Sequence, residues 1–96
     1  MENISVKNQE AESRGSFYIE DNGQKIAEMT YSKAGTDRII IDHTEVSDEY
    51  RGQKLGEKMV LKAVEHAREK KISIVPLCPF ARAVFQRRHD EFEDVL

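Results

Sequence analysis

Cysteine and histidine are the residue types in this chain that could do nucleophilic chemistry together. Cys78 precedes Pro79, which suits the first position of a helix, so the thiol is expected at a helix N-cap, where the helix dipole favours the thiolate. Strand alternation predicts that His43 shares a face with Ile39 and Ile41. Because a histidine beside a cysteine activates the thiol, Cys78 and His43 are candidate catalytic residues. A buried core cysteine and a hydrogen-bonded core histidine are the alternatives.

A polar turn between an apolar strand and a long amphipathic helix is the second chemical feature. Residues 42–56 read DHTEVSDEYRGQKLG, with Gly52 and Gly56 around the start of the helix. The first amides of a helix have no partner within it, and together with the helix dipole they form a site for phosphate or pyrophosphate. Gly56 costs a helix about 1 kcal/mol relative to alanine, which indicates a close approach of phosphate or sheet. A purely structural turn with a packing glycine is the alternative.

Length and composition limit the class of protein. The 96 residues suit a single domain over residues 1–96, and 39% hydrophobic with 34% charged residues is typical of a folded chain. A net charge of −3 argues against a general attraction to nucleic acid or to a membrane surface, and no apolar run approaches a membrane span. With one cysteine and no signal-peptide pattern, the chain is expected to be cytoplasmic. The histidines and the cysteine show no metal-ligand spacing, so no metal is expected.

The apolar periodicity predicts a strand meander followed by a helical half. Strands are expected at residues 4–7, 17–20, 25–32 and 38–46, and Asn22-Gly23 predicts a tight hairpin turn. Helical spacing runs from residue 54 to residue 70, a short apolar strand follows at residues 72–75, and a second helix covers residues 80–88. Residues 91–95 are expected to form a last short strand.

The order of these elements predicts the fold class. A strand, a helix and another strand form a right-handed crossover, so residues 72–75 should lie parallel to residues 38–46. The predicted fold is therefore α+β, with a mixed, mainly antiparallel sheet, one parallel strand pair and two helices.

This order of elements, with Arg51, Leu55 and Gly56 at the turn, resembles the GNAT superfamily of acetyl-CoA-dependent N-acetyltransferases. The family motif is Arg/Gln-x-x-Gly-x-Gly/Ala after the central strand, and Lys54 stands here where the family generally has glycine. A short, stand-alone branch of the superfamily is more closely similar over residues 15–95, in DHTEV, AVEHAREK and PLCPFARAVFQRRHDEF. The resemblance implies a GNAT-like acyl-CoA N-acyltransferase fold whose parallel strands splay apart.

The resemblance also implies which residues bind acetyl-CoA or coenzyme A. The loop backbone would cradle the pyrophosphate, and the edge of the central strand would hydrogen-bond the pantetheine amides. By match, the loop residues are Arg51, Gly52, Gln53, Lys54, Leu55 and Gly56, and the strand residues are Thr44, Glu45 and Val46. Arg82 belongs to a positive patch with Arg87, Arg88 and His89, in a region that lies near the CoA nucleotide in the family. A solvated helix end is the alternative for this patch.

The activity implied is transfer of acetyl from CoA to an unidentified amine, on a small molecule or a protein, either directly or through Cys78. The cysteine could act as a nucleophile when ionised, or as an acid when protonated. Many members use a tyrosine on the second helix to protonate the leaving thiolate, whereas this chain has Phe80 and Phe85 there. In the short branch, the residues corresponding to Cys78 and His43 are suspected catalytic residues. Residues 8–16 are too few for the two helices that help bind the acceptor elsewhere, so the acceptor site is either very open or supplied by a partner. A non-catalytic acyl-CoA-binding or regulatory module is the alternative function.

Overall fold

The first layer of the molecule is a five-stranded sheet, seen here in a computed structural model that describes residues 5–96. Its strands are β1 Lys7–Glu10, β2 Arg14–Asp21, β3 Gln24–Lys33, β4 Arg38–Val46 and β5 Ser73–Pro76. They lie side by side in chain order; the first four are antiparallel neighbours, and β5 runs parallel to β4. The predicted α+β class and the predicted parallel pair are thus confirmed.

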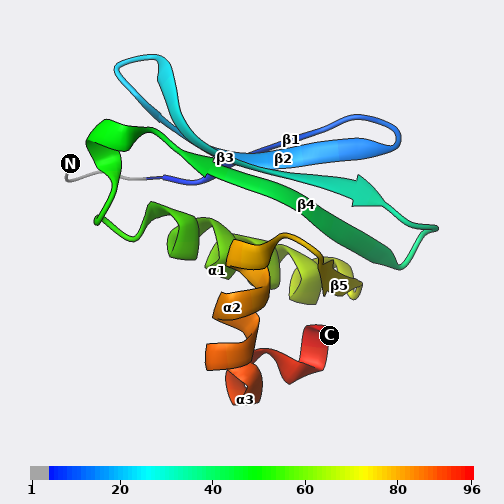
Figure 1. Cartoon of the computed structure of the whole chain (residues 1–96). Helices are drawn as coiled ribbons and strands as arrows, with labels where there is room; N and C mark the ends of the chain where they lie inside the picture. The colour runs from blue at the N-terminus through cyan, green and yellow to red at the C-terminus, as the bar shows by residue number, and fades with distance from the viewer. Residues whose placement is uncertain (1–4) are drawn as a thin grey trace.

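The helices form the second layer, on one side of the sheet (Figure 1). Helix α1, Leu55–Lys70, lies along the sheet, and α2, Pro79–Arg87, packs against α1. The 3-10 turn η1, Asp48–Tyr50, follows β4, while α3, His89–Phe92, and the 3-10 turn η2, Glu93–Val95, come last. None of the helices within residues 5–96 is long and apolar enough to cross a membrane.

The core lies between α1 and the sheet because both present apolar residues at the spacing of their own backbone. On α1 the buried residues recur every three or four positions: Leu55, Gly56, Met59, Val60, Ala63, Val64 and Ala67. The sheet contributes residues that are at most 2% exposed, among them Phe17, Met29, Tyr31, Ile39 and Ile41. Burying each large apolar side chain stabilises the fold by roughly 1.5–3 kcal/mol. This packing fixes β4 relative to α1, and with it the loop between them.

Local sequence signals located most elements correctly. Asn22 and Gly23 join β2 to β3 with φ of 54° and 77°, as the hairpin signal predicted. The predicted bounds of β4 agree with the structure. The first helix begins one residue late, at Leu55, and both β5 and α2 are displaced from their predicted ranges by a single residue.

The first strand was predicted three residues too early. Residue 4 lies outside the described residues, and the strand observed is Lys7–Glu10, whose side chains are all exposed. Backbone pairing with β2 holds β1 in the sheet. The hydroxyl of Tyr31 also holds it, because this hydroxyl donates a hydrogen bond to Glu10 and accepts one from Asn8. These contacts are long-range, so an apolar pattern could not locate the strand.

The predicted last strand, at residues 91–95, is wrong. This segment forms the end of α3 and the turn η2. Phe92 and Val95 are both 2% exposed, and their separation of three residues suits a helical turn better than an alternating strand. The ring of Phe92 also packs on that of Phe85, with centroids 5.3 Å apart. Packing of Phe92 and Val95 in the core therefore favours a helical form for residues 91–95 over a strand.

Candidate functional site

Strands β4 and β5 pair at one end only. The register joins residues 38–41 to Ser73–Pro76, and the amides of Leu77 and Cys78 then both donate to the carbonyl of Ile41, at 3.2 and 3.1 Å. Past Ile41, no strand of the described residues lies beside this edge of β4. The edge at residues 44–46 is therefore free to bond another extended chain.

The loop between η1 and α1 supplies a second set of free backbone groups. Within residues 5–96, no backbone carbonyl accepts a hydrogen bond from the amides of residues 52–57, and the amide of Lys58 is the first to donate, to the carbonyl of Lys54 at 3.1 Å. Gly52 and Lys54 both have positive φ, of 85° and 59°. Free amides at a helix start, together with the helix dipole, attract an anion.

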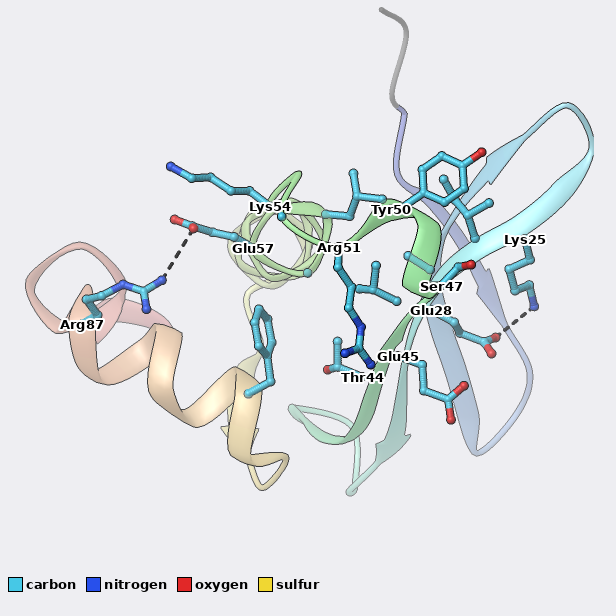
Figure 2. Close-up of a pocket in the computed structure, with 17 residues that line it drawn as sticks. Lys25, Glu28, Thr44, Glu45, Ser47, Tyr50, Arg51, Lys54, Glu57 and Arg87 are labelled. Carbon is cyan, nitrogen blue, oxygen red and sulfur yellow. Dashed lines mark hydrogen bonds and ion pairs between the residues drawn. The ribbon is translucent and has the colours of Figure 1, made fainter. Parts of the chain in front are cut away.

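The strand edge and the loop line one cleft of about 1050 Å³ (Figure 2). Of the residues predicted to bind a cofactor, those on the cleft are Thr44, Glu45, Val46, Arg51, Gly52, Lys54, Leu55 and Gly56. Residues of the cleft that sequence reasoning missed include Lys25, Glu28, Tyr50, Glu57 and Phe80. Strand pairing brings the first two to the cleft, and helix packing brings Phe80, so no local motif signals these three. Arg87, a member of the positive patch that the resemblance placed near the CoA nucleotide, also lines the cleft.

Phe80 explains the glycine at position 56. A Cβ atom on Gly56 would lie 2.6 Å from the ring of Phe80, so only glycine allows this ring to approach the first turn of α1. The ring is 42% exposed and lines the cleft. Packing of a ring is thus the close approach at this position, which agrees with the alternative of a packing glycine.

The end of the cleft near α2 carries surplus positive charge. Glu57 has a side chain only 17% exposed and pairs with two arginines: Arg88 at 2.6 Å and Arg87 at 3.6 Å. Because Arg88 makes the shorter contact with Glu57, the charge of Arg87 is not fully neutralised. The side chain of Arg87 is 61% exposed and lines the cleft. Lys54 and Arg87 are drawn with Glu57 in Figure 2.

Tyr50 anchors the turn that precedes the loop. Its hydroxyl donates to Asp21 Oδ2 at 2.6 Å, and this hydrogen bond raises the pKa of Tyr50. Asp21 ends β2, so the bond joins η1 to the β2–β3 hairpin. It holds the start of the loop in place.

His43 does not lie on the face of β4 that the alternation predicted. Ile41 pairs with Tyr31, whereas His43 pairs with Thr30, so Asp42 is an extra residue in β4 and forms a β-bulge. Beyond the bulge, the buried face of the sheet receives Thr44, the partner of the buried Met29. The side chain of His43 is 63% exposed on the other face and contacts Glu45 at 2.9 Å.

Cys78 is the N-cap of α2, as predicted, but its neighbour is a threonine. The thiol is 4% exposed and donates to Thr44 Oγ1 at 3.3 Å. The structure therefore separates the two predicted catalytic residues and pairs the cysteine with Thr44. The bulge, set by the pairing of two strands, is the reason.

Two of the predicted cofactor residues do not line the cleft. Gln53 is exposed in the loop, and Arg82 donates to the carbonyl of Leu77 at 3.4 Å. Arg82 and Arg87 are five residues apart on α2, which places them on different faces of the helix. Near α3, His89, Asp90 and Glu93 bring possible ligand atoms within 4.8 Å of one another, but all three are exposed, and such groups are common without a metal.

Comparison with known protein families defines the class of this protein. The family model described as GCN5-related N-acetyl-transferase matches residues 16–95. The chain therefore belongs to the GCN5-related N-acetyltransferase, or GNAT, family. A search of curated proteins found no match.

Solved structures agree with this assignment. A GCN5-like protein from Staphylococcus aureus is similar with a TM-score of 0.71 and 40% identity, over 99% of this chain and 89% of that one. Ribosomal-protein-alanine N-acetyltransferase from Brucella melitensis biovar Abortus 2308 shares the fold, with a TM-score of 0.69, 15% identity and coverage of 81% and 62%. AAC(6')-Iy, solved with the bisubstrate analogue CoA-S-monomethyl-acetylneamine, also shares it, with a TM-score of 0.58, 13% identity and coverage of 80% and 61%.

Proposed function

We propose that this protein binds acetyl-CoA in the cleft and transfers its acetyl group to an amine. The observation that carries the proposal is the meeting of two sets of unpaired backbone groups in one cleft: the β4 edge at residues 44–46 and the amides of residues 52–57. Coenzyme A has the complementary groups in the same order, because its pantetheine amides lead to a pyrophosphate. The CoA-containing analogue held by AAC(6')-Iy, a protein of the same fold, supports this choice of ligand.

This placement gives the bound molecule a direction. With the pyrophosphate at the loop, pantetheine runs back along β4 and the thioester lies near Thr44. The thiol of Cys78 is hydrogen-bonded to Thr44 at that same end. Cys78 is therefore the candidate nucleophile: its sulfur forms a bond to the acetyl carbon, CoA leaves as the thiol, and the amine then takes the acetyl group from sulfur. Direct attack of the amine on acetyl-CoA gives the same products.

The acceptor side of the cleft is open in this family member. Strand β1 passes through a short turn directly into β2, so residues 7–21 form no helix there. The acceptor amine would then reach the thioester from solvent, or on the surface of a partner. The part of His43 in catalysis stays a prediction.

Cofactor binding is tested with coenzyme A and with desulfo-CoA, which lacks the sulfur. We expect calorimetry to detect both, and amide spectra to show shifts at residues 44–46 and 52–57 but not in β1, which lies at the far edge of the sheet and serves as the internal control. Absence of heat and of amide shifts with millimolar coenzyme would reject the proposal.

A second candidate function is a non-catalytic acyl-CoA-binding module. The observation that favours it is the aromatic content of α2, where Phe80 and Phe85 offer no hydroxyl to protonate a leaving thiolate. CoA release in the presence of a panel of amines separates enzyme from binder. Radiolabelled acetyl on the wild type, but not on Cys78→Ala, would support the covalent route, and full turnover by Cys78→Ala would support direct transfer.

A further inference from the structure

We propose that Thr44 positions the Cys78 thiol at the cleft and carries its proton during acetyl transfer, a role that the sequence suggested for His43. This inference rests on the proposed function and deepens it. The bulge at Asp42 turns Thr44 toward α2 and His43 away from it.

Thr44 is a polar residue that both contacts the thiol and lines the cleft. Its side chain lines the cleft and its Oγ1 atom accepts the hydrogen bond from Cys78 Sγ, at 3.3 Å. Cys78 itself is 4% exposed and is not among the residues that line the cleft. The hydroxyl of Thr44 is therefore in a position to join the buried sulfur to a bound thioester.

Backbone contacts tie both partners of this hydrogen bond to β4. Thr44 is fixed by pairing with Met29, which is fully buried. The amide of Cys78 donates to the carbonyl of Ile41 at 3.1 Å, three residues before Thr44. Because each residue is tied to β4, the sulfur and the hydroxyl keep their separation as the cleft fills.

His43 has no comparable path to the sulfur. It pairs with Thr30 on the face of the sheet opposite the buried Met29, and its imidazole contacts Glu45 at 2.9 Å. With 63% of its side chain exposed, it faces solvent. The β4 backbone separates it from Cys78.

A hydroxyl suits the proton transfer that the covalent route requires, because it can accept one proton while it donates another. As the sulfur of Cys78 bonds to the acetyl carbon, the bond from that carbon to the CoA sulfur breaks. Thr44 takes the thiol proton and passes its own to the CoA sulfur, which leaves as the thiol. In the second step the amine attacks acetyl-Cys78, and a proton from nitrogen returns through Thr44 to the cysteine sulfur. Protons and electrons balance without an added base.

The test compares the rate of alkylation of Cys78 by iodoacetamide across pH, without CoA. Thr44→Val keeps the shape of the side chain and removes the hydroxyl, so we expect its rate–pH profile to differ from that of the wild type. Thr44→Ser restores a hydroxyl and should restore the profile. Thr30→Val, a matched change on the opposite face of the sheet, and His43→Gln should both leave the profile unchanged.

Turnover provides the second readout. We expect Thr44→Val to lower kcat about a hundred-fold while the KM for acetyl-CoA stays within about two-fold, since the hydroxyl acts in proton transfer. A thiol profile and kcat that stay unchanged in Thr44→Val, or that change in His43→Gln, would overturn the proposal. His43 is exposed, so its variant is expected to fold and decides the question even if Thr44→Val is unstable. Loss of CoA binding by the wild type would instead reject the proposed function, which the thiol profile does not test.

Discussion

Lys54 adopts a left-handed backbone conformation at the N-cap of α1, with φ 59° and ψ 30°. The Cβ atom of an ordinary residue in that region costs roughly 1–2 kcal/mol. The family motif that the sequence resembles has glycine here, which adopts this conformation without the cost. Lysine keeps the backbone amide and adds a positive charge to the loop that is proposed to bind the pyrophosphate, so this residue combines backbone strain with a charge suited to phosphate.

Replacing Lys54 with glycine should therefore stabilise the fold. Relief of roughly 1–2 kcal/mol of strain exceeds the roughly 0.5–1 kcal/mol that glycine loses through its freedom in the unfolded chain. We expect Lys54→Gly to raise the free energy of unfolding by about 0.5–1 kcal/mol in urea titrations.

Lys58, an exposed residue within α1, offers the matched control. Lys58→Gly should lower the free energy of unfolding by about 1 kcal/mol, because glycine is unfavourable inside a helix. Destabilisation by both substitutions would contradict the account of strain at Lys54.

At the scale of elements, Gly56 and Phe80 join α1 to α2 at the cleft. In Gly56→Ala the new methyl group meets the ring of Phe80, which is 42% exposed and can move into the cleft. The gain of about 1 kcal/mol in helix propensity offsets the lost packing. We expect the free energy of unfolding to change by less than about 1 kcal/mol, and the affinity for CoA to fall about ten-fold by calorimetry.

The double variant separates these effects. In a Phe80→Ala background the obstructing ring is gone, so adding Gly56→Ala should leave CoA affinity unchanged. An equal loss of affinity in both backgrounds would show that the methyl group acts on the ligand directly, not through the ring.

Helix α2 also presents Arg87 to the cleft, seven residues and about two turns after Phe80. Because Arg88 already neutralises Glu57, we expect Arg87→Gln to weaken CoA binding about ten-fold at low salt through loss of a charge-assisted contact. Titrations at higher salt should show a smaller effect. Arg38→Gln removes an exposed arginine at the other end of β4 and should change affinity little; an equal loss there would indicate a general charge effect.

The sequence predicts a feature of the fold correctly where short-range rules determine that feature, and fails where a contact between distant residues determines it. The hairpin at Asn22-Gly23 and the apolar stripe of α1 follow from short-range rules, and both were predicted correctly. The bulge at Asp42 depends on the register of β3 against β4, so alternation along one strand assigned His43 to the wrong face. The contact of Gly56 with Phe80 joins two helices, and only the fold shows it.

At the scale of the whole molecule, Tyr31 links three strands of the sheet. Its side chain is fully buried, its hydroxyl donates to Glu10 at 2.8 Å, and it accepts a hydrogen bond from Asn8 at 3.1 Å. A Cβ on Gly15 of β2 would lie 2.5 Å from that hydroxyl, so glycine makes room for it. Burial first, and then the nearby carboxylate of Glu10, raise the pKa of Tyr31 to about 12.

This raised pKa makes folding stability depend on alkaline pH. The phenol of Tyr31 stays protonated in the fold up to about pH 12, whereas in the unfolded chain it ionises near pH 10. Above pH 10 the unfolded state binds fewer protons than the folded state, so the free energy of unfolding falls with pH. One such group contributes a slope of at most about 1.4 kcal/mol per pH unit between these two values.

Urea unfolding between pH 9 and pH 12 measures this slope, with Tyr31→Phe as the comparison. The phenylalanine variant is less stable near neutral pH, because Glu10 and Asn8 lose a partner, but it lacks the group that titrates. Its stability should therefore fall less steeply above pH 10 than that of the wild type. Equal slopes in the wild type and Tyr31→Phe would mean that groups other than Tyr31 cause the alkaline loss of stability.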